Sequence, residues 1–343
     1  MRIGVLTAGG DAAGLNAAVR ALGRRALSDG HELFGVHNGW AGLVDEPDMS
    51  PLTRLSLSGV IAQGGTLLGS VRFDLDDPVG GRQEVLTNIA ANFDALVAIG
   101  GDGTLTIARW LADHGAPVIG VPKTLDNDLS GTDYCIGFDT AVSIVSESLD
   151  RLHTTAASHH RVMVLETMGR ATGWVAAMGG LAGGADFIVI PEYPSSIAEI
   201  VAHIQSRRAQ GSAFSIVVIA EGVAPSDLGG TNLDSVEQDP VGHPNYASRG
   251  IGHFVAERIR LETGYETRAT VLGYVQRGGT PTAHDRIWAS YLGSASYDAV
   301  VASAWGQIPV VRGGAVVTVP LSEVTTSRRA VPRELYELCA RFF

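Results

Sequence analysis

One pattern constrains the fold of this chain more than any other: apolar runs end in glycines or turns, and amphipathic segments follow them. Residues 2–10, 95–103 and 117–123 are such runs, and residues 13–30 and 104–115 have apolar side chains at helical spacing. Nearly continuous apolar strands are typical of parallel sheets that helices cover on both faces. The pattern predicts an α/β fold with mainly parallel sheets.

The same alternation continues through the rest of the chain, with a long helix in the middle. Further strands are expected at 32–39, 161–169, 187–192, 215–222, 269–279 and 315–320. Further helices are expected at 139–158 and 332–343. Residues 224–250 are polar and rich in glycine and proline, so we expect a loop there.

Length and composition favour two lobes in one chain. The 343 residues are 45% apolar, which is enough for a large core and for two lobes. No linker divides the sequence, so interleaved lobes are favoured over two domains in tandem.

Charge and cysteine content exclude several classes of protein. The net charge of −11 argues against a general nucleic-acid surface, although a pocket can still be locally basic. Cys135 and Cys339 form no C-x-x-C pair, so neither a zinc cage nor a disulfide framework is predicted. The N-terminal apolar run is too short for a signal peptide or a membrane span. We therefore expect a soluble, cytoplasmic protein that binds neither membrane nor nucleic acid.

The glycine turns at strand ends are candidate phosphate sites. In "GGDGT" (100–104), glycines leave backbone N–H groups open and the following helix directs its positive end toward an anion. Asp102 offers a hard oxygen to Mg²⁺, or it simply caps the helix. Neither the P-loop pattern G-x-x-x-x-G-K-[ST] nor G-x-G-x-x-G occurs in these turns. A nicotinamide-binding Rossmann domain is therefore disfavoured.

Acids and arginines gather at other strand ends. The stretch "GVPKTLDNDLSGTDY" (120–134) holds three aspartates and one lysine. It is either a solvated turn or a site where a carboxylate takes a proton or faces a metal. Five arginines stand beside glycines or strand ends, where a guanidinium can bind phosphate in bidentate fashion: Arg72, Arg161, Arg170, Arg268 and Arg277.

Six motifs in order resemble those of the phosphofructokinase A family. They are "GGDAAGLNAAVR", "GGTLLGSVRF", "GGDGT", "PKTLDNDLSGTDYCIGFDTA", "SHHRVMVLETMGRATGW" and "ETRATVLGYVQRGGTPTAHDR", and they span the chain from about Met1 to Arg286. The resemblance implies two interleaved three-layer α/β lobes with the active site in the cleft. It also implies Mg²⁺-dependent transfer of phosphoryl from ATP to the 1-hydroxyl of fructose 6-phosphate, a step of glycolysis, in a homotetramer or homodimer.

The resemblance also assigns roles to individual positions. Asp126 would be the general base, flanked by Thr124 and Asp128, which would help hold the sugar and the metal, and Asp102 would lie near Mg²⁺. The donor site would contain Gly10, Arg72, Phe73, Gly101, Asp102, Gly103 and Thr104. The sugar would contact Met168, Gly169, Arg170 and Glu221, with Arg170 also near the transferring phosphoryl group. Arg161 and Arg268 would reach the 6-phosphate from a neighbouring subunit, and Arg277 would lie beside the sugar phosphate.

These roles divide the chain into expected parts. Residues 1–137 would form the donor lobe that binds ATP and Mg²⁺, and residues 138–300 the sugar-phosphate lobe. Residues 301–343 would pack back as a C-terminal segment.

Two positions give conflicting indications about the donor. In the family, glycine at Gly103 leaves room for the α-phosphate of ATP, whereas lysine at Lys123 is frequent in pyrophosphate users. We weigh Gly103 more heavily, because a side chain there would block the nucleotide, while a flexible lysine can move aside or bind a phosphate. ATP is the predicted donor and pyrophosphate the alternative.

Tyr274 is the sharpest departure from the family pattern. In "LGYVQRGG" the family usually has a histidine that contacts the sugar phosphate. A tyrosine keeps a donor but loses the possible positive charge, so a kinase for a related anionic ketose, such as a sulfonated or differently phosphorylated sugar, stays open as an alternative. A catalytically inactive ligand-binding subunit is the competing hypothesis from another class, and the acidic and basic residues retained at these positions argue against it.

Overall fold

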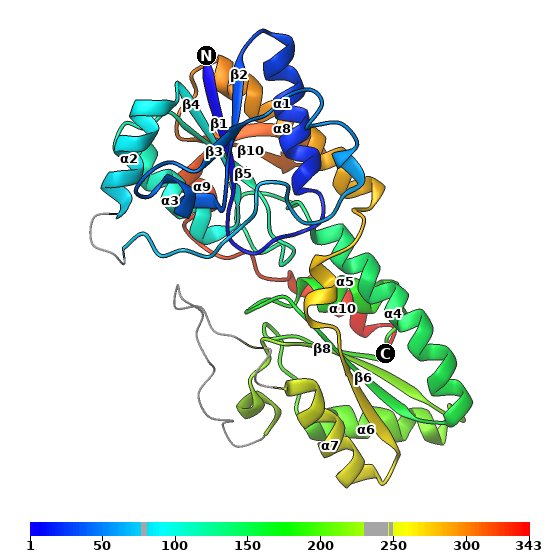
Figure 1. The fold of residues 1–343 in the computed structure, drawn as a ribbon. Coiled ribbons are helices and arrows are strands. Elements are labelled where there is room, and N and C mark those ends of the chain that lie inside the picture. Colours follow the sequence, from blue (N-terminus) through cyan, green and yellow to red (C-terminus); the bar gives the residue numbers. More distant parts are fainter. Residues whose placement is uncertain (77–80, 230–245, 247–249) are drawn as a thin grey trace. The chain divides into compact units, whose positions relative to one another are not determined.

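The computed structural model describes residues 1–76, 81–229, 246 and 250–343 (Figure 1). The chain forms two compact units. The first unit contains Met1–Thr140 and Arg277–Arg329, and the second contains Ala141–Gln276 and Ala330–Phe343. The backbone therefore passes from one unit to the other three times, which confirms the expected interleaving.

The first unit is built on a five-stranded sheet with the order β3-β2-β1-β4-β5. Its strands are β1 (Arg2–Thr7), β2 (Glu32–Val36), β3 (Met49–Pro51), β4 (Ala95–Gly100) and β5 (Val118–Pro122). All neighbouring strands are parallel except β2 and β3. β4 and β5 are buried at every residue, as expected for strands with helices on both faces.

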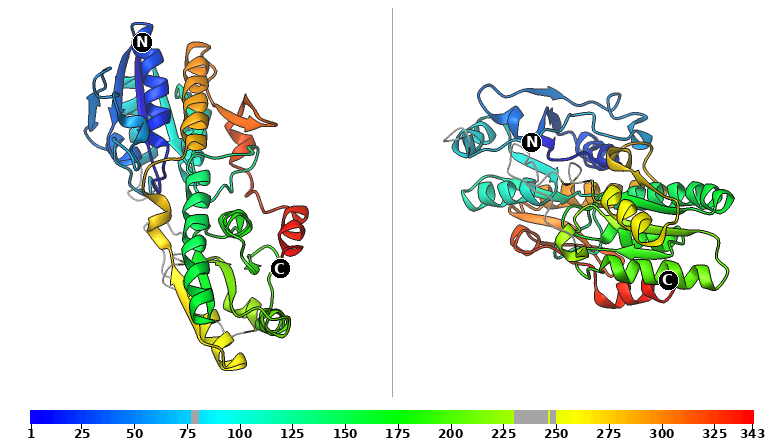
Figure 2. Two further views of the ribbon diagram at one scale, coloured as in Figure 1. Left: turned by 90° about the vertical axis from the view of Figure 1, so that its right-hand side faces the viewer. Right: turned by 90° about the horizontal axis from the view of Figure 1, so that it is seen from below.

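Helices cover this sheet on two sides. One layer contains α1 (Leu15–Ser28) and α8 (Ala283–Val301), which lie side by side in Figure 2. The other contains α2 (Gly81–Asn92) and α3 (Asp102–Asp113). A Cβ atom at Gly293 of α8 would lie 2.3 Å from the carbonyl oxygen of Ala18, so this glycine permits the close approach of α1 and α8.

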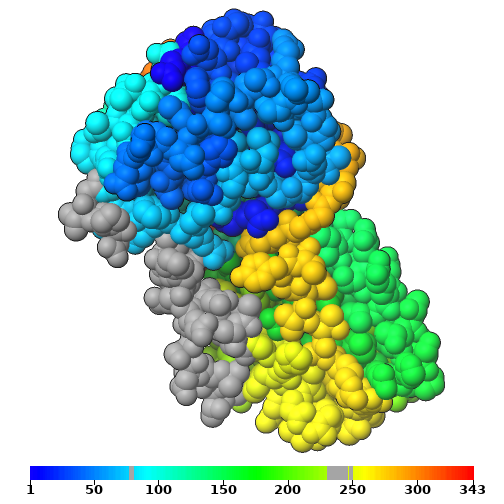
Figure 3. Space-filling view, in the orientation of Figure 1, coloured from blue at the N-terminus to red at the C-terminus, as the bar shows by residue number. Residues whose placement is uncertain are grey.

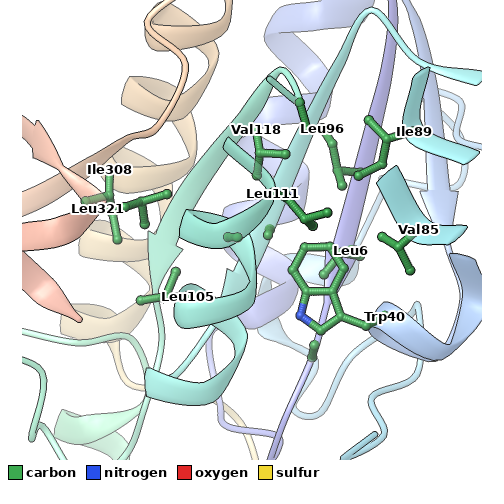
Figure 4. Packing of buried hydrophobic residues seen from close by; sticks show 14 of the residues in the cluster. Leu6, Trp40, Val85, Ile89, Leu96, Leu105, Leu111, Val118, Ile308 and Leu321 are labelled. Atoms are coloured by element: carbon green, nitrogen blue, oxygen red, sulfur yellow. The ribbon is translucent and has the colours of Figure 1, made fainter. Parts of the chain in front are cut away.

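Smaller elements complete the first unit. They are the 3₁₀ helices η1 (Gly39–Leu43) and η2 (Val60–Ala62), the antiparallel hairpin of β10 (Gln307–Arg312) and β11 (Ala315–Pro320), and α9 (Leu321–Val324). The hydrophobic core on the α2–α3 side extends to this hairpin, because Ile308 and Leu321 join Leu6, Leu96 and Val118 in one buried cluster (Figure 4).

The second unit has a fully parallel four-stranded sheet with the order β7-β8-β6-β9. Its strands are β6 (Val162–Thr167), β7 (Phe187–Val189), β8 (Ser215–Ala220) and β9 (Thr267–Val271). α5 (Trp174–Ala182) and α10 (Arg333–Ala340) pack on β7, while α7 (Ile251–Thr263) packs on β6 and β9 with α6 (Ile197–Ala209) beside it. The long α4 (Phe138–His159) begins in the first unit and continues into the second, where its Val145 and Leu149 contact glycines at the end of α5.

The predicted α/β class with mainly parallel sheets is confirmed, but two parts of the prediction need correction. The expected part 138–300 does not stay together, because Arg277–Arg329 belongs to the first unit, where α8 packs on α1 and β10 on β5. The strand expected at 269–279 ends at Val271, and Gly273, with φ of 50°, begins the 3₁₀ helix η5 (Gly273–Arg277).

The loop expected at 224–250 lies largely outside the described residues. The described part contains the short 3₁₀ helix η3 (Pro225–Leu228). Across the described stretches of the chain, no helix has the length and apolar character needed to cross a membrane.

Candidate functional site

Three loops of the first unit meet at one edge of its sheet. β1, β4 and β5 are adjacent and parallel, so the loops that follow them leave from the same edge. The N–H of Ala8 donates to Ile99 O at 3.0 Å, and the N–H of Lys123 donates to Gly100 O at 2.9 Å. The sequence motifs "AGGD", "GGDGT" and "PKTLDND" are therefore neighbours in space.

The glycine turn after β4 touches both other loops. A Cβ at Gly101 would lie 3.8 Å from Thr124 Cβ, and a Cβ at Gly9 would lie 3.5 Å from Thr104 Oγ1. Asp102 is the first residue of α3, is partly exposed, and has the exposed Gly103 beside it. The start of α3 and this open glycine turn leave backbone N–H groups of the kind that bind anions, so phosphate binding here stays a prediction.

Lys123 is fixed beneath the first glycine loop. Its side chain is buried, with 3% exposed, and Nζ donates to Ala8 O at 3.2 Å and to Gly10 O. The expectation of a flexible lysine is therefore wrong, because carbonyl oxygens bind the ammonium group in place. This contact also places the positive charge of the ammonium group next to the backbone of Gly10.

The acidic loop, residues 124–133, holds its carboxylates in a buried turn. Asp126 is 4% exposed and Asp128 6% exposed, so the reading as a solvated acidic turn is wrong for both. Asp126 N donates to Thr124 Oγ1 at 3.2 Å. Asn127 between the aspartates has a left-handed backbone, with φ of 51°, and its Oδ1 accepts a 3.0 Å hydrogen bond from Cys135 N. Two buried carboxylates thus flank a residue whose side chain fixes the turn.

Two arginines border the first glycine loop. The segment that carries Arg72 is held by Ser70 Oγ, which donates to Gly9 O at 2.6 Å. Arg277 is 7% exposed, donates from Nη1 to Asp11 O at 3.0 Å, and lies against the backbone of Gly10. Arg277 therefore belongs to the first unit and its glycine loop, whereas the sequence alone grouped it with the sugar-binding residues. Phe73 packs partly buried against the hydrophobic core.

The donor atoms near the glycine turn suit a magnesium ion that is held mainly by a substrate. No group of three or more metal-ligating side chains occurs among the described residues. Mg²⁺ commonly binds one or two carboxylates together with phosphate oxygens and waters, and dedicated protein cages are less common. Asp102, partly exposed at the start of α3, provides a carboxylate of that kind.

A second group of predicted residues lies at the carboxyl edge of the sheet in the second unit. β6 and β8 are parallel neighbours, so the turns that follow them are adjacent. Oε1 of the buried Glu221 accepts hydrogen bonds from Gly169 N at 3.3 Å and Arg170 N at 3.0 Å. Arg170 has a left-handed backbone, with φ of 51°, and Met168 is 9% exposed beside it. Glu221 therefore acts on the backbone of this turn and fixes the point from which the Arg170 side chain extends.

Tyr274 lies at the same edge and is open to solvent. Its side chain is 72% exposed, and Val275 next to it is 61% exposed. Met168 N donates to Gln276 Oε1 at 3.2 Å, which ties η5 to the turn after β6. Part of the segment 266–276, coloured gold, is visible on the face of the second unit in Figure 3, although Thr267 and Gln276 are buried. A partner or ligand can therefore reach Tyr274.

Arg161 and Arg268 lie at the opposite edge of the same sheet. Arg161 precedes β6 and Arg268 is the second residue of β9, so both lie at the amino ends of their strands. One atom, Oε1 of Glu266, accepts from Arg161 Nη2 at 2.9 Å and from Arg268 Nη2 at 2.8 Å. The hydrogen bond from Arg161 lowers the pKa of Glu266, so the carboxylate stays ionised at neutral pH. The structure thus brings the two arginines together but separates them from Met168 and Arg170 by the length of β6.

Several residues with clear structural roles were not identified from the sequence. Glu266 could have been identified from the sequence, because it is a carboxylate two positions before Arg268, one of the predicted phosphate-binding arginines. Gln276 and Arg329 could not have been identified in this way, because their contacts join segments far apart in the chain. The buried position of Lys123 was also unpredictable from its neighbours in sequence.

Known proteins with similar sequences identify the family of this chain. The family model for phosphofructokinase matches residues 2–300. An ATP-dependent 6-phosphofructokinase of Chloroflexus aggregans is 45% identical over 352 residues, which cover 99% of this chain and 96% of the relative. A pyrophosphate–fructose 6-phosphate 1-phosphotransferase of Amycolatopsis methanolica is also 45% identical, over all of both chains. The chain belongs to the phosphofructokinase family.

Solved structures agree with this assignment. The crystal structure of Pichia pastoris phosphofructokinase in the T-state matches with a TM-score of 0.83 at 30% identity. The match covers 99% of this chain and 36% of the yeast chain. A pyrophosphate-dependent phosphofructokinase from Marinobacter aquaeolei shares the fold, with a TM-score of 0.82 at 21% identity. Two relatives that use different donors are equally similar in sequence, so similarity alone does not identify the donor of this chain.

Proposed function

We propose that this protein transfers the γ-phosphoryl group of ATP to the 1-hydroxyl of fructose 6-phosphate and so forms fructose 1,6-bisphosphate. The observation that carries the proposal is the packing of the buried Asp126 loop against the "GGDGT" turn, through Gly101 and Thr124. This packing supports the proposal, because phosphoryl transfer needs the base and the groups that bind the donor phosphates to lie close together.

Each group has a chemical role in this reaction. Asp126 accepts the proton of the sugar hydroxyl, and Thr124 and Asp128 keep the loop and the sugar in place. The turn Gly101–Thr104 binds phosphate oxygens, and Asp102 would hold the Mg²⁺ that neutralises their charge. Gly10, Arg72 and Phe73 border the donor, while Arg72 and Arg170 stabilise charge in the transition state.

The second unit would bind the sugar. Met168, Gly169, Arg170 and Glu221 lie together at one edge, with Tyr274 nearby. We assign Arg277 to the phosphate groups, since its guanidinium group lies beside Gly10.

The arrangement of Arg161 and Arg268 supports a site shared between subunits. The six residues of β6 span roughly 20 Å, which separates these arginines from Met168 and Arg170 within one chain. A fructose phosphate is too small to reach both edges, so a neighbouring copy would supply the arginines to the 6-phosphate. A homotetramer or homodimer acting in glycolysis in the cytoplasm is part of this proposal.

Pyrophosphate is the second candidate donor, and Lys123 favours it. The buried ammonium group behind Gly10 places positive charge near a donor phosphate, and a relative named for pyrophosphate is 45% identical. The exposed Gly103 favours ATP, because no side chain closes the space at the start of α3.

Initial rates with fructose 6-phosphate and Mg²⁺, measured in parallel with ATP and with pyrophosphate, test the proposal. Fast turnover with ATP alone is the expected result. Fast turnover with pyrophosphate alone would assign the other donor. Slow turnover with both would direct attention to Tyr274 and to other anionic ketoses.

A further inference from the structure

The acidic loop is bonded to a segment that is distant in the sequence, residues 311–329, which we call the C-terminal clamp. Asp133 N donates to Val311 O at 2.7 Å, and Ser130 Oγ donates to Glu323 O at 2.9 Å. These bonds join the loop to the β10–β11 hairpin and to α9. The clamp therefore restricts the loop that carries the proposed general base.

One residue of the clamp contacts the acidic loop at its middle and at its far end. Arg329 N donates to Asp128 O at 2.7 Å, and Arg329 Nη1 donates to Asp133 O at 2.9 Å. Arg328 next to it forms an antiparallel backbone bridge with Leu129. The main chain of the clamp holds the middle of the acidic loop, while the guanidinium group of Arg329 binds its far end.

A second contact fixes the far end of the acidic loop, at Asp133. Asp133 Oδ2 accepts from Gly313 N, in the hairpin turn, at 2.7 Å. Burial lowers the pKa of Arg329, although the nearby Asp133 acts in the opposite direction. Because the guanidinium group is charged, its hydrogen bond to the carbonyl oxygen of Asp133 is directional and charge-assisted, and such a bond is stronger than a neutral one.

We propose that Arg329 is a positioning residue for catalysis: its guanidinium group fixes the acidic loop and thereby the orientation of Asp126. This inference rests on the proposed function, in which Asp126 is the base. Asp126 lies between Thr124, which packs beside Gly101, and Asp133, whose carbonyl oxygen accepts the hydrogen bond from Arg329 Nη1. A displacement of a reacting group by about 1 Å can cost about 10²-fold in rate, so loosening one of these contacts is expected to lower kcat.

The surroundings of Arg329 allow a chemical test. An open hollow of about 600 Å³ lies between the loop and the clamp. It is lined by Ser130, Gly131, Thr132, Asp133, Arg312, Gly313 and Arg329. A small guanidinium ion can therefore enter the space that the side chain vacates when Arg329 is replaced by alanine.

The experiment compares Arg329→Ala, Arg329→Lys and the control Arg328→Ala. Arg328 is exposed and contributes to the bridge through its backbone, which alanine retains. We expect kcat of Arg329→Ala to fall about 10- to 100-fold, a larger change than in either KM, because the base must be aligned for the chemical step. Lysine should restore part of the loss, and millimolar methylguanidinium should raise kcat of Arg329→Ala while leaving Arg329→Lys and Arg328→Ala unchanged.

Amide hydrogen exchange provides a measurement that does not depend on turnover. Arg329→Ala should speed exchange in residues 125–135, and Arg328→Ala should not. Unchanged kcat in Arg329→Ala, or equal losses in Arg329→Ala and Arg328→Ala, would overturn the inference while the proposed function stands. An inactive wild-type enzyme would instead refute the proposed function. In that case, unchanged hydrogen exchange in Arg329→Ala would also reject the role of Arg329 in anchoring the acidic loop.

Discussion

The acidic loop of the first unit and the arginine pair of the second unit are both rich in charge, but they are built differently. The hydrogen bonds described above for Asp126, Asp128 and Lys123 come from the first unit of the same chain. Arg161 and Arg268 instead meet one exposed glutamate, at the sheet edge opposite to the other proposed sugar ligands. Under the proposed function, this difference predicts that the base and the glycine turn act within one chain, whereas a second copy supplies the arginines for the 6-phosphate.

The largest effect on kcat is expected from replacing Asp126, the proposed general base. Asp126→Asn keeps the size and polarity of the side chain but removes the base. We expect kcat to fall about 10²- to 10⁴-fold, with the KM for the sugar little changed. Steady-state kinetics with a thermal-unfolding control measures this, and a loss of less than tenfold would show that Asp126 is not the base.

A second prediction concerns Asp285, a fully buried residue whose carboxylate binds the segment that follows the acidic loop. Its carboxylate accepts hydrogen bonds from Gly137 N, from Thr140 N and Oγ1, and from the Tyr134 hydroxyl. An asparagine would turn an N–H toward these donors, so Asp285→Asn should destabilise the protein by about 2–4 kcal/mol. Urea denaturation measures the loss, and an unchanged midpoint would contradict this reading of Asp285.

Glu166 in the second unit provides the matched control for Asp285. It is 2% exposed and accepts a hydrogen bond from Gly252 N at 2.8 Å, and burial raises its pKa. A raised carboxyl pKa means that stability falls as pH rises through the unfolded-state pKa toward the folded-state one. Glu166→Gln should therefore raise the Tm near pH 7, and the gain should shrink as the pH falls toward about 4. A gain that is independent of pH would exclude this explanation.

The smallest effect is expected at the arginine pair. Glu266→Gln keeps an oxygen that can bridge Arg161 and Arg268 but removes one negative charge. We expect the KM for the sugar phosphate to fall only about two- to fivefold, since an exposed charge pair contributes little. Because Arg161 holds the pKa of Glu266 below its usual value, the difference should persist at mildly acidic pH.

Glu257→Gln is the control for that substitution, since Glu257 pairs with Arg260 on the exposed face of α7. Equal KM values in Glu266→Gln and wild type, or the same shift in Glu257→Gln, would refute a role of Glu266 at the phosphate site.

The sequence predicted the α/β class and the local turns well, because strand periodicity and glycine turns are encoded by neighbouring residues. "GGDGT" and "TLDND" were assigned correctly to strand ends, and the structure adds that these strands, β4 and β5, are parallel neighbours. α8 and the β10–β11 hairpin could not be assigned to the first unit, because their packing on α1 and β5 depends on contacts distant in the chain. For the same reason, neither the contacts of Arg329 nor the fixed position of Lys123 could be predicted from the sequence.

The most direct test of the central claim is subunit complementation between Asp126→Asn and Arg161→Ala. Each variant alone should be nearly inactive on fructose 6-phosphate. If a neighbouring copy supplies Arg161, mixed oligomers formed by co-expression contain some sites with neither defect, and activity should return to about a quarter of the wild-type level. If Arg161 serves the site of its own chain, every site keeps one defect. Activity no higher than that of the separate variants would then contradict the account.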